Sequence, residues 1–192
     1  MKIIQSKYFD TGYFIKFILF YIILNYSHLF FFALITPGGM YLPFVAGDLN
    51  YINWIIDSVL HTANVFCKTL GMDTYVTMHD IRVPQGVGVR MSFACIGFGI
   101  MSLWIAFITA HKTNLKTKLV WSLGGVFTIW FINCCRIAIL LIALDHRSKV
   151  ISFIDHHTIF NLVTYSVIAF IMYLYIRSEK ESLSFTLRTK LV

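Results

Sequence analysis

The sequence has little charge, since only 13% of its 192 residues are Asp, Glu, Lys or Arg, whereas 58% are hydrophobic. A soluble domain of this length could not bury so much apolar surface, so a water-soluble globular protein is excluded. The chain also lacks a repeat of fixed period and a low-complexity segment. We therefore expect one integral membrane domain over residues 1–192, with the lipid bilayer as its solvent.

Cysteine is scarce as well, with four residues, and no two of them have the C-x-x-C spacing. The seven histidines give no zinc pattern either, so the sequence predicts no metal site and no cofactor. Cys134 and Cys135 fall inside an apolar run, where small packing residues are expected. Cys67 could form a disulfide with Cys95 if both face an oxidising compartment. Cys95 is therefore a packing residue, a disulfide partner or a nucleophile.

Acidic residues are outnumbered, nine against sixteen Lys and Arg, which gives a net charge of +7. The positive residues flank apolar runs and do not form a stripe, so we expect no nucleic-acid partner and explain the charge by membrane topology. Residues 1–12, the loop Lys112–Lys118 and the basic tail 177–192 are predicted to be cytoplasmic. No small-x-small site clearly follows the first apolar run, so no cleaved signal peptide is expected.

Long apolar runs make up nearly half of the chain. Four are predicted to cross a hydrocarbon core about 30 Å thick, namely Tyr13–Ile35, Ala94–Ala110, Leu119–Leu144 and His156–Ile176. Thr36-Pro37-Gly38-Gly39 ends the first run, because Pro and Gly stop a helix. The sequence thus predicts an all-α membrane protein, with a bundle of about four transmembrane helices over residues 13–176.

The segment between the first two spans is more polar. Met40–Asp48 is predicted to be a loop. Tyr51–Leu70 has apolar residues at helical spacing but also carries Asn53, Asp57 and His61, so it is predicted to be an amphipathic helix. We favour a position in the membrane interface, since a charge at the bilayer centre costs at least about 2.5 kcal/mol. The sequence leaves open whether this helix spans the membrane.

Short β-branched stretches follow at Thr74–Met78, Ile81–Val83 and Val87–Met91. Pro84-Gln85-Gly86 separates the last two. These stretches predict a small extended hairpin outside the hydrocarbon, on the extracytoplasmic side. The hairpin leads directly into the apolar run that Cys95 opens.

In this topology three reactive groups share the outer half of the membrane. Cys95 begins a helix that runs inward, and His156 and His157 begin another. Arg136 lies about two turns inside the outer end of the third span, or about 12 Å at about 1.5 Å per residue. The helix boundaries follow from hydrophobicity alone and do not depend on these groups. That the groups nevertheless share one depth in the membrane therefore indicates a functional site.

A cysteine, an arginine and a histidine at one membrane surface suffice for acyl transfer. A cysteine attacks as a thiolate, and because its ordinary pKa is about 8.5, a nearby imidazole takes the proton and later returns it to a leaving amine. A fixed cation such as Arg136 stabilises the negative oxygen of the transition state, and losing such a donor costs about 3 kcal/mol or more. The structural alternative is an ion pair of Arg136 with Asp57 or Asp80.

Three short motifs resemble those of the exosortase/archaeosortase family of multi-span cysteine transpeptidases. That family has a Cys-Ser/x-Gly motif at the start of a span, an Asn-x-x-Arg in a later span and a His motif at the start of the next. The matching segments, in the same order, are Ala94-Cys95-Ile96-Gly97, Asn133-Cys134-Cys135-Arg136-Ile137 and His157-Thr158-Ile159-Phe160-Asn161. The chain departs from the pattern at Ile96, where Ser is common, and at Asn161, where Gly is common.

The resemblance implies an exosortase-like protease or transpeptidase in the cell inner membrane, with its active site facing the periplasm or exterior. Cys95 would be the nucleophile that forms a thioester, His157 the acid and base, and Arg136 the group that holds the oxyanion. The supporting or substrate-binding residues would be Asn133, His156, Asn161 and Gly97, with His156 also the second candidate for the acid and base.

The resemblance also implies partners. These are secreted proteins that end in a short motif, a transmembrane helix and a basic tail, which such enzymes cut at the outer face before passing the acyl group to a surface acceptor. Two other interpretations compete with it. One is a non-catalytic membrane assembly or transport subunit with Arg136 in a structural ion pair, and the other is a thiol redox protein that uses Cys67 and Cys95.

Overall fold

The computed structural model describes residues 11–145 and 156–189, which fall into two compact units. Helices dominate both units, which confirms the predicted all-α membrane protein. The elements of the first unit are α2 (Thr11–Ile35), α3 (Pro43–Gly47), α4 (Tyr51–Thr69), β1 (Tyr75–Val76), β2 (Asp80–Arg82), β3 (Gly88–Arg90), the 3-10 helix η1 (Phe93–Ile96), α5 (Phe98–Ala110) and α6 (Leu115–Asp145). The second unit contains α8 (His156–Thr189).

Three helices of the described residues are long and apolar enough to cross a membrane. They are α2, α6 and the stretch Asn161–Glu179 of α8. Large apolar side chains are exposed along α2 and α6, including Phe14, Ile18, Ile22, Phe30, Leu123 and Phe127. In a membrane protein such side chains face lipid, because the bilayer takes the place of a surrounding core.

The predicted span Ala94–Ala110 is divided in the structure. Phe93–Ile96 forms a 3-10 turn, and α5 begins only at Phe98. With 13 residues, α5 is about 20 Å long, against about 30 Å for the hydrocarbon core. Cys95 therefore lies in a short turn before the helix, and the prediction that it opens the helix is wrong. The cause is Gly97, whose left-handed φ of +82° separates the two elements.

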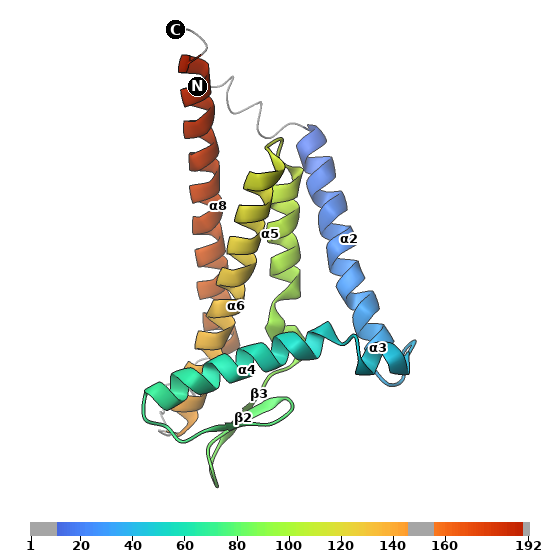
Figure 1. Ribbon diagram of the computed structural model, residues 1–192, viewed down its shortest axis with the longest axis vertical. Helices are drawn as coiled ribbons and strands as arrows, with labels where there is room; N and C mark the ends of the chain where they lie inside the picture. Colours follow the sequence, from blue (N-terminus) through green and yellow to red (C-terminus); the bar gives the residue numbers. More distant parts are fainter. Residues whose placement is uncertain (1–10, 146–155, 190–192) are drawn as a thin grey trace. The chain divides into compact units, whose positions relative to one another are not determined.

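Within the first unit, α2, α5 and α6 run side by side (Figure 1), with α2 packed on α5 and α5 packed on α6. The buried Trp104 of α5 donates from its Nε1 to the Trp121 carbonyl of α6, at 2.9 Å. A Cβ at Gly125 would overlap the Trp104 indole. Gly125 therefore permits the close approach of α5 and α6.

Helix α4 lies across the direction of these three helices in Figure 1 and packs on α6. Its buried face recurs every three or four residues and comprises Ile52, Ile56, Val59, Leu60, Ala63 and Cys67. Trp130 of α6 donates from its Nε1 to the Ser58 hydroxyl of α4, at 3.0 Å. The predicted amphipathic helix is thus confirmed. Its direction in the unit supports the interfacial placement, which stays a prediction.

The extended segment is a three-stranded antiparallel sheet in the order β1-β2-β3, and each of the three predicted β-branched stretches contributes one strand. Its register pairs Asp80 with Arg90, and the Asp80 carboxylate accepts from Arg90 Nε at 2.9 Å and from Arg82 Nη2 at 3.1 Å. These bonds lower the pKa of Asp80 below its ordinary value, and the bond from Arg90 has the largest effect. Pairing continues past β3, because the Met91 amide donates to the His79 carbonyl at 2.9 Å.

Three other boundaries differ from the sequence prediction. The predicted loop Met40–Asp48 contains the short helix α3, which Pro43 begins with its fixed φ. Helix α6 starts at Leu115, inside the predicted basic loop, because the Asn114 side chain caps it by accepting the Thr117 amide at 2.7 Å. Helix α8 continues through most of the predicted tail 177–192, to Thr189. The predicted cytoplasmic start 1–12 lies mostly outside the described residues.

Candidate active site

The turn η1 carries Cys95. The Cys95 amide donates to the Ser92 carbonyl at 2.9 Å, and the Ser92 hydroxyl lies 3.4 Å from the Cys95 sulfur. Cys95 is half-buried, whereas Cys67 and Cys134 are buried. All four cysteines are described and are free thiols, so the proposed Cys67–Cys95 disulfide is not formed in this structure. Burial raises the pKa of Cys67, which makes that thiol a poor nucleophile.

Gly97 and Asn133 hold the turn in place. The Asn133 side chain of α6 donates from Nδ2 to the Ile96 carbonyl at 2.9 Å, and this bond is buried. A Cβ at Gly97 would lie 3.3 Å from Ile100 and 3.4 Å from Ile129, in addition to the strain of its positive φ. The structure thus brings both predicted supporting residues to the residues directly after Cys95.

Arg136 lies one helical turn beyond Asn133 on α6 and is 7% exposed. Residues three apart share one side of a helix, and α6 contacts both η1 and β3. Arg136 and the Asn133 that bonds to the Ile96 carbonyl therefore lie on the same side of α6. Asp80, one of the two acids considered as a structural partner for Arg136, makes its ion pairs with Arg82 and Arg90.

The predicted acid and base are at the start of α8. His156 and His157 are its first two residues, and Asn161 lies in its second turn. The side chains of both histidines lie outside the described part of the structure. Their placement beside Cys95 therefore stays a prediction.

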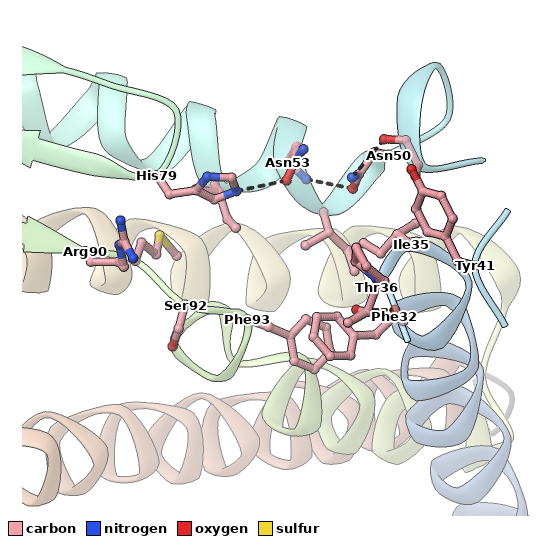
Figure 2. A pocket seen from close by; sticks show the side chains of 15 residues that line it. Phe32, Ile35, Thr36, Tyr41, Asn50, Asn53, His79, Arg90, Ser92 and Phe93 are labelled. Atoms are coloured by element: carbon pink, nitrogen blue, oxygen red, sulfur yellow. Dashed lines mark hydrogen bonds between the residues drawn. The ribbon is translucent and has the colours of Figure 1, made fainter. Parts of the chain in front are cut away.

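A cavity of about 530 Å³ adjoins the turn. It lies among the end of α2, α3, α4, β3 and η1 (Figure 2). Apolar side chains form one part of its lining, among them Phe32, Ile35, Ile52, Ile56, Met91 and Phe93. The polar part comprises Asn50, Asn53, His79, Arg90 and Ser92. A mixed lining of this kind and size suits a polypeptide segment better than a lipid tail.

None of the polar residues that line this cavity was predicted as a site residue from the sequence. His79 lies 3.3 Å from the Asn53 side-chain oxygen, measured from Nε2, so the sheet and α4 meet through this pair (Figure 2). Arg90 reaches the cavity from β3. Only Ser92 carried a usable signal, since it precedes Cys95 by three residues, the spacing that a 3-10 turn brings together.

A second, smaller cavity of about 110 Å³ is lined by Gly97. Asn25 and His28 of α2 line it with Gly97, Phe98 and Gly99. His28 is fixed there, because its Nδ1 lies 2.9 Å from the Tyr51 hydroxyl and its ring stacks on Phe98.

The described residues offer no candidate metal site, since they contain no group of three or more His, Cys, Asp or Glu side chains that could hold a metal ion.

The fold and the turn define a class: a small helical membrane protein with a half-buried thiol beside a cavity at one end of its helices. Comparison with protein families is more specific. The model of the family described as transmembrane exosortase matches residues 5–174. The match covers most of the chain, so the chain belongs to the transmembrane exosortase family, as the three motifs predicted. Its function is a membrane function of the exosortase type, and the family is generally one of membrane cysteine peptidases or transpeptidases.

Two further searches add no relative. Neither the curated proteins nor the solved structures gave a match.

Proposed function

We propose that this protein is a cysteine peptidase or transpeptidase that cleaves carboxy-terminal sorting signals of secreted proteins at the outer face of the cell inner membrane. One observation carries the proposal. The turn with Cys95 is tied by Asn133 to the helix that also carries the buried Arg136. A thiol nucleophile and a fixed cation that can stabilise an oxyanion are two of the groups that acyl transfer uses.

The reaction has two halves. The Cys95 thiolate attacks the scissile carbonyl, and the Arg136 guanidinium stabilises the oxyanion that forms. The carbon–nitrogen bond breaks as His157, or His156, gives a proton to the leaving amine, which leaves a thioester on Cys95. Water or an acceptor amine then attacks the thioester and gives its proton to the same imidazole. The carbon–sulfur bond breaks, the acyl group leaves, and the imidazole returns this proton to the Cys95 sulfur, which regenerates the thiol.

The cavity beside Ser92 is the place for the substrate polypeptide in this scheme. Ser92 and Phe93 line it, and both are within three residues of Cys95. A substrate with its own transmembrane helix would present the cleaved segment at the membrane surface. Helix α4 borders this cavity and lies across the direction of α2, α5 and α6 (Figure 1), so an interfacial α4 would put the cavity at the level of that segment.

The test is processing of a co-expressed secreted protein that ends in a short motif, an apolar helix and basic residues. Cys95→Ala should leave this substrate at full length while the variant still inserts into the membrane fraction. Cys135→Ala, which changes another half-buried thiol, is the matched control and should process normally. Normal processing by Cys95→Ala would rule out covalent catalysis at this residue and favour a non-catalytic assembly or transport subunit.

A further inference from the structure

Ser92 makes two contacts with Cys95. Its carbonyl accepts the Cys95 amide at 2.9 Å, and its hydroxyl lies 3.4 Å from the sulfur. The hydroxyl makes no capping bond to the turn. It is therefore available to the sulfur and has no backbone role of its own.

Both flanks of this pair are anchored. Before Ser92, the buried Met91 donates its amide to the His79 carbonyl, which joins the chain to the sheet. After Cys95, the buried Ile96 carbonyl accepts from Asn133. Ser92 itself is exposed and Cys95 half-buried. The hydroxyl and the sulfur are thus held next to each other by a fixed backbone at an accessible place.

The direction of the bond depends on the charge of the sulfur. A thiol can donate its hydrogen to the hydroxyl oxygen, or accept from the hydroxyl. A thiolate has no hydrogen to give, so the Ser92 hydroxyl must then be the donor. Donation to the charged form stabilises it relative to the neutral thiol. The same bond also restricts the rotation of the sulfur about the side chain of Cys95.

We propose that Ser92 is a positioning residue for Cys95, whose hydroxyl donates to the thiolate and holds it beside the cavity that Ser92 lines. When the sulfur attacks a carbonyl, its negative charge passes to the carbonyl oxygen and the hydroxyl loses its charged partner. The bond therefore acts on the free enzyme, before the acyl group is attached. The proposal rests on the proposed function, in which Cys95 is the nucleophile, but its first test measures the thiol alone.

The experiment follows alkylation of Cys95 by iodoacetamide as a function of pH, in the full-length protein in detergent, with the Cys95 peptide quantified by mass spectrometry. In Ser92→Ala the labelling profile should move to higher pH, with labelling at pH 7 slower by roughly threefold to tenfold, the factor that one hydrogen bond contributes. Ser92→Thr keeps the hydroxyl and should restore the profile. Ser27→Ala is the control, because that hydroxyl bonds to the Leu24 carbonyl within α2.

A Ser92→Ala profile equal to that of the unchanged protein would overturn the proposal, as would a Ser92→Thr profile shifted as far as that of Ser92→Ala. Ser92→Gly provides the same comparison if the alanine variant does not insert. Processing separates this proposal from the proposed function. If the labelling profile of Ser92→Ala is shifted, the role of Ser92 is supported even when Cys95→Ala processes the substrate normally. If that profile is not shifted and Cys95→Ala is inactive, only the role of Ser92 is overturned and the proposed function stands.

Discussion

The two ends of the group formed by α2, α5 and α6 are built differently. At one end Tyr13 of α2 and His111, directly after α5, pack ring against ring with centroids 4.6 Å apart. Phe107 closes the cluster at 4.8 Å from the His111 ring. The His111 Nδ1 donates to the Phe107 carbonyl at 2.8 Å, and burial lowers the pKa of this histidine. We call this the packed end.

The opposite end, which we call the open end, carries η1, α4 and the sheet. Here a cavity of about 530 Å³ separates the aromatic side chains of Phe32 and Phe93 from the polar side chains of Asn53 and His79. The thiol of Cys95 is half-buried. Both ends therefore contain a histidine and aromatic rings, but the cavity gives the open end room for a polypeptide. The arrangement of these residue types, and not their presence, therefore distinguishes a site from a helix contact.

The largest effect should come from a conservative change at the open end. Arg136→Lys should slow processing by about 100-fold or more, because a point charge does not replace the planar fork that stabilises an oxyanion. The control at the packed end is Lys118→Arg, where the Lys118 amino group donates to the Thr109 carbonyl at 2.7 Å. It should leave the rate unchanged. A fully active Arg136→Lys variant would instead indicate simple charge steering.

A smaller effect is expected where the two ends are connected, at the contact of α5 with α6. Gly125→Ala would press a methyl group into the Trp104 indole and should lower the free energy of unfolding by about 1–3 kcal/mol. Gly124→Ala is an ideal neighbour for comparison, since its Cβ would meet nothing within 4 Å. It should be neutral or stabilising by up to about 1 kcal/mol. Thermal unfolding in detergent measures both, and equal destabilisation would contradict the packing described.

The smallest effect is a loss of stability of the sheet at the open end when the pH is lowered. The pKa of Asp80 is lowered below its ordinary 3.8, chiefly by the Arg90 hydrogen bond. The ionised carboxylate therefore stabilises the sheet fully above the ordinary pKa, and this stabilisation is lost as the pH falls through the lower folded-state value. Hydrogen exchange of the Met91 amide, corrected for its intrinsic rate, should show constant protection from pH 7 to about 5 and a loss below about 4.

Two substitutions separate this loss from general acid unfolding. Asp80→Asn should reduce the protection of Met91 at neutral pH and flatten its dependence on acid. Asp73→Asn, at an exposed residue before β1, should keep the profile of the unchanged protein. A profile in the unchanged protein that is flat down to pH 3 would contradict the role of the Asp80 ion pairs.

The sequence was informative where one local signal decides the structure. Helix α2 ends at Ile35, directly before the predicted Thr36-Pro37-Gly38-Gly39 stop. Helix α4 runs over Tyr51–Thr69, within one residue of its prediction, because its apolar periodicity is strong. The three motifs also identified the family that the comparison shows.

The rest depends on long-range contacts. The run around Cys95 is apolar enough for a continuous helix, but Gly97 divides it, and the turn is held in place by Asn133, which lies 37 residues after Ile96. His79 reaches the cavity only because the sheet pairs it with Met91. Hydrophobicity alone predicts that the last helix ends at Ile176. Helix α8 continues beyond that residue because the charged residues that follow favour helix.

The central claim is that Cys95 carries the acyl group during processing. The most direct measurement is the mass of the protein after acid quenching of membranes that are processing a substrate. If Cys95 carries the acyl group, its peptide should bear an adduct equal in mass to the substrate segment before the cleavage site, and neutral hydroxylamine should remove it. Continued processing in the Cys95→Ala variant, with no such adduct in the unchanged protein, would contradict it.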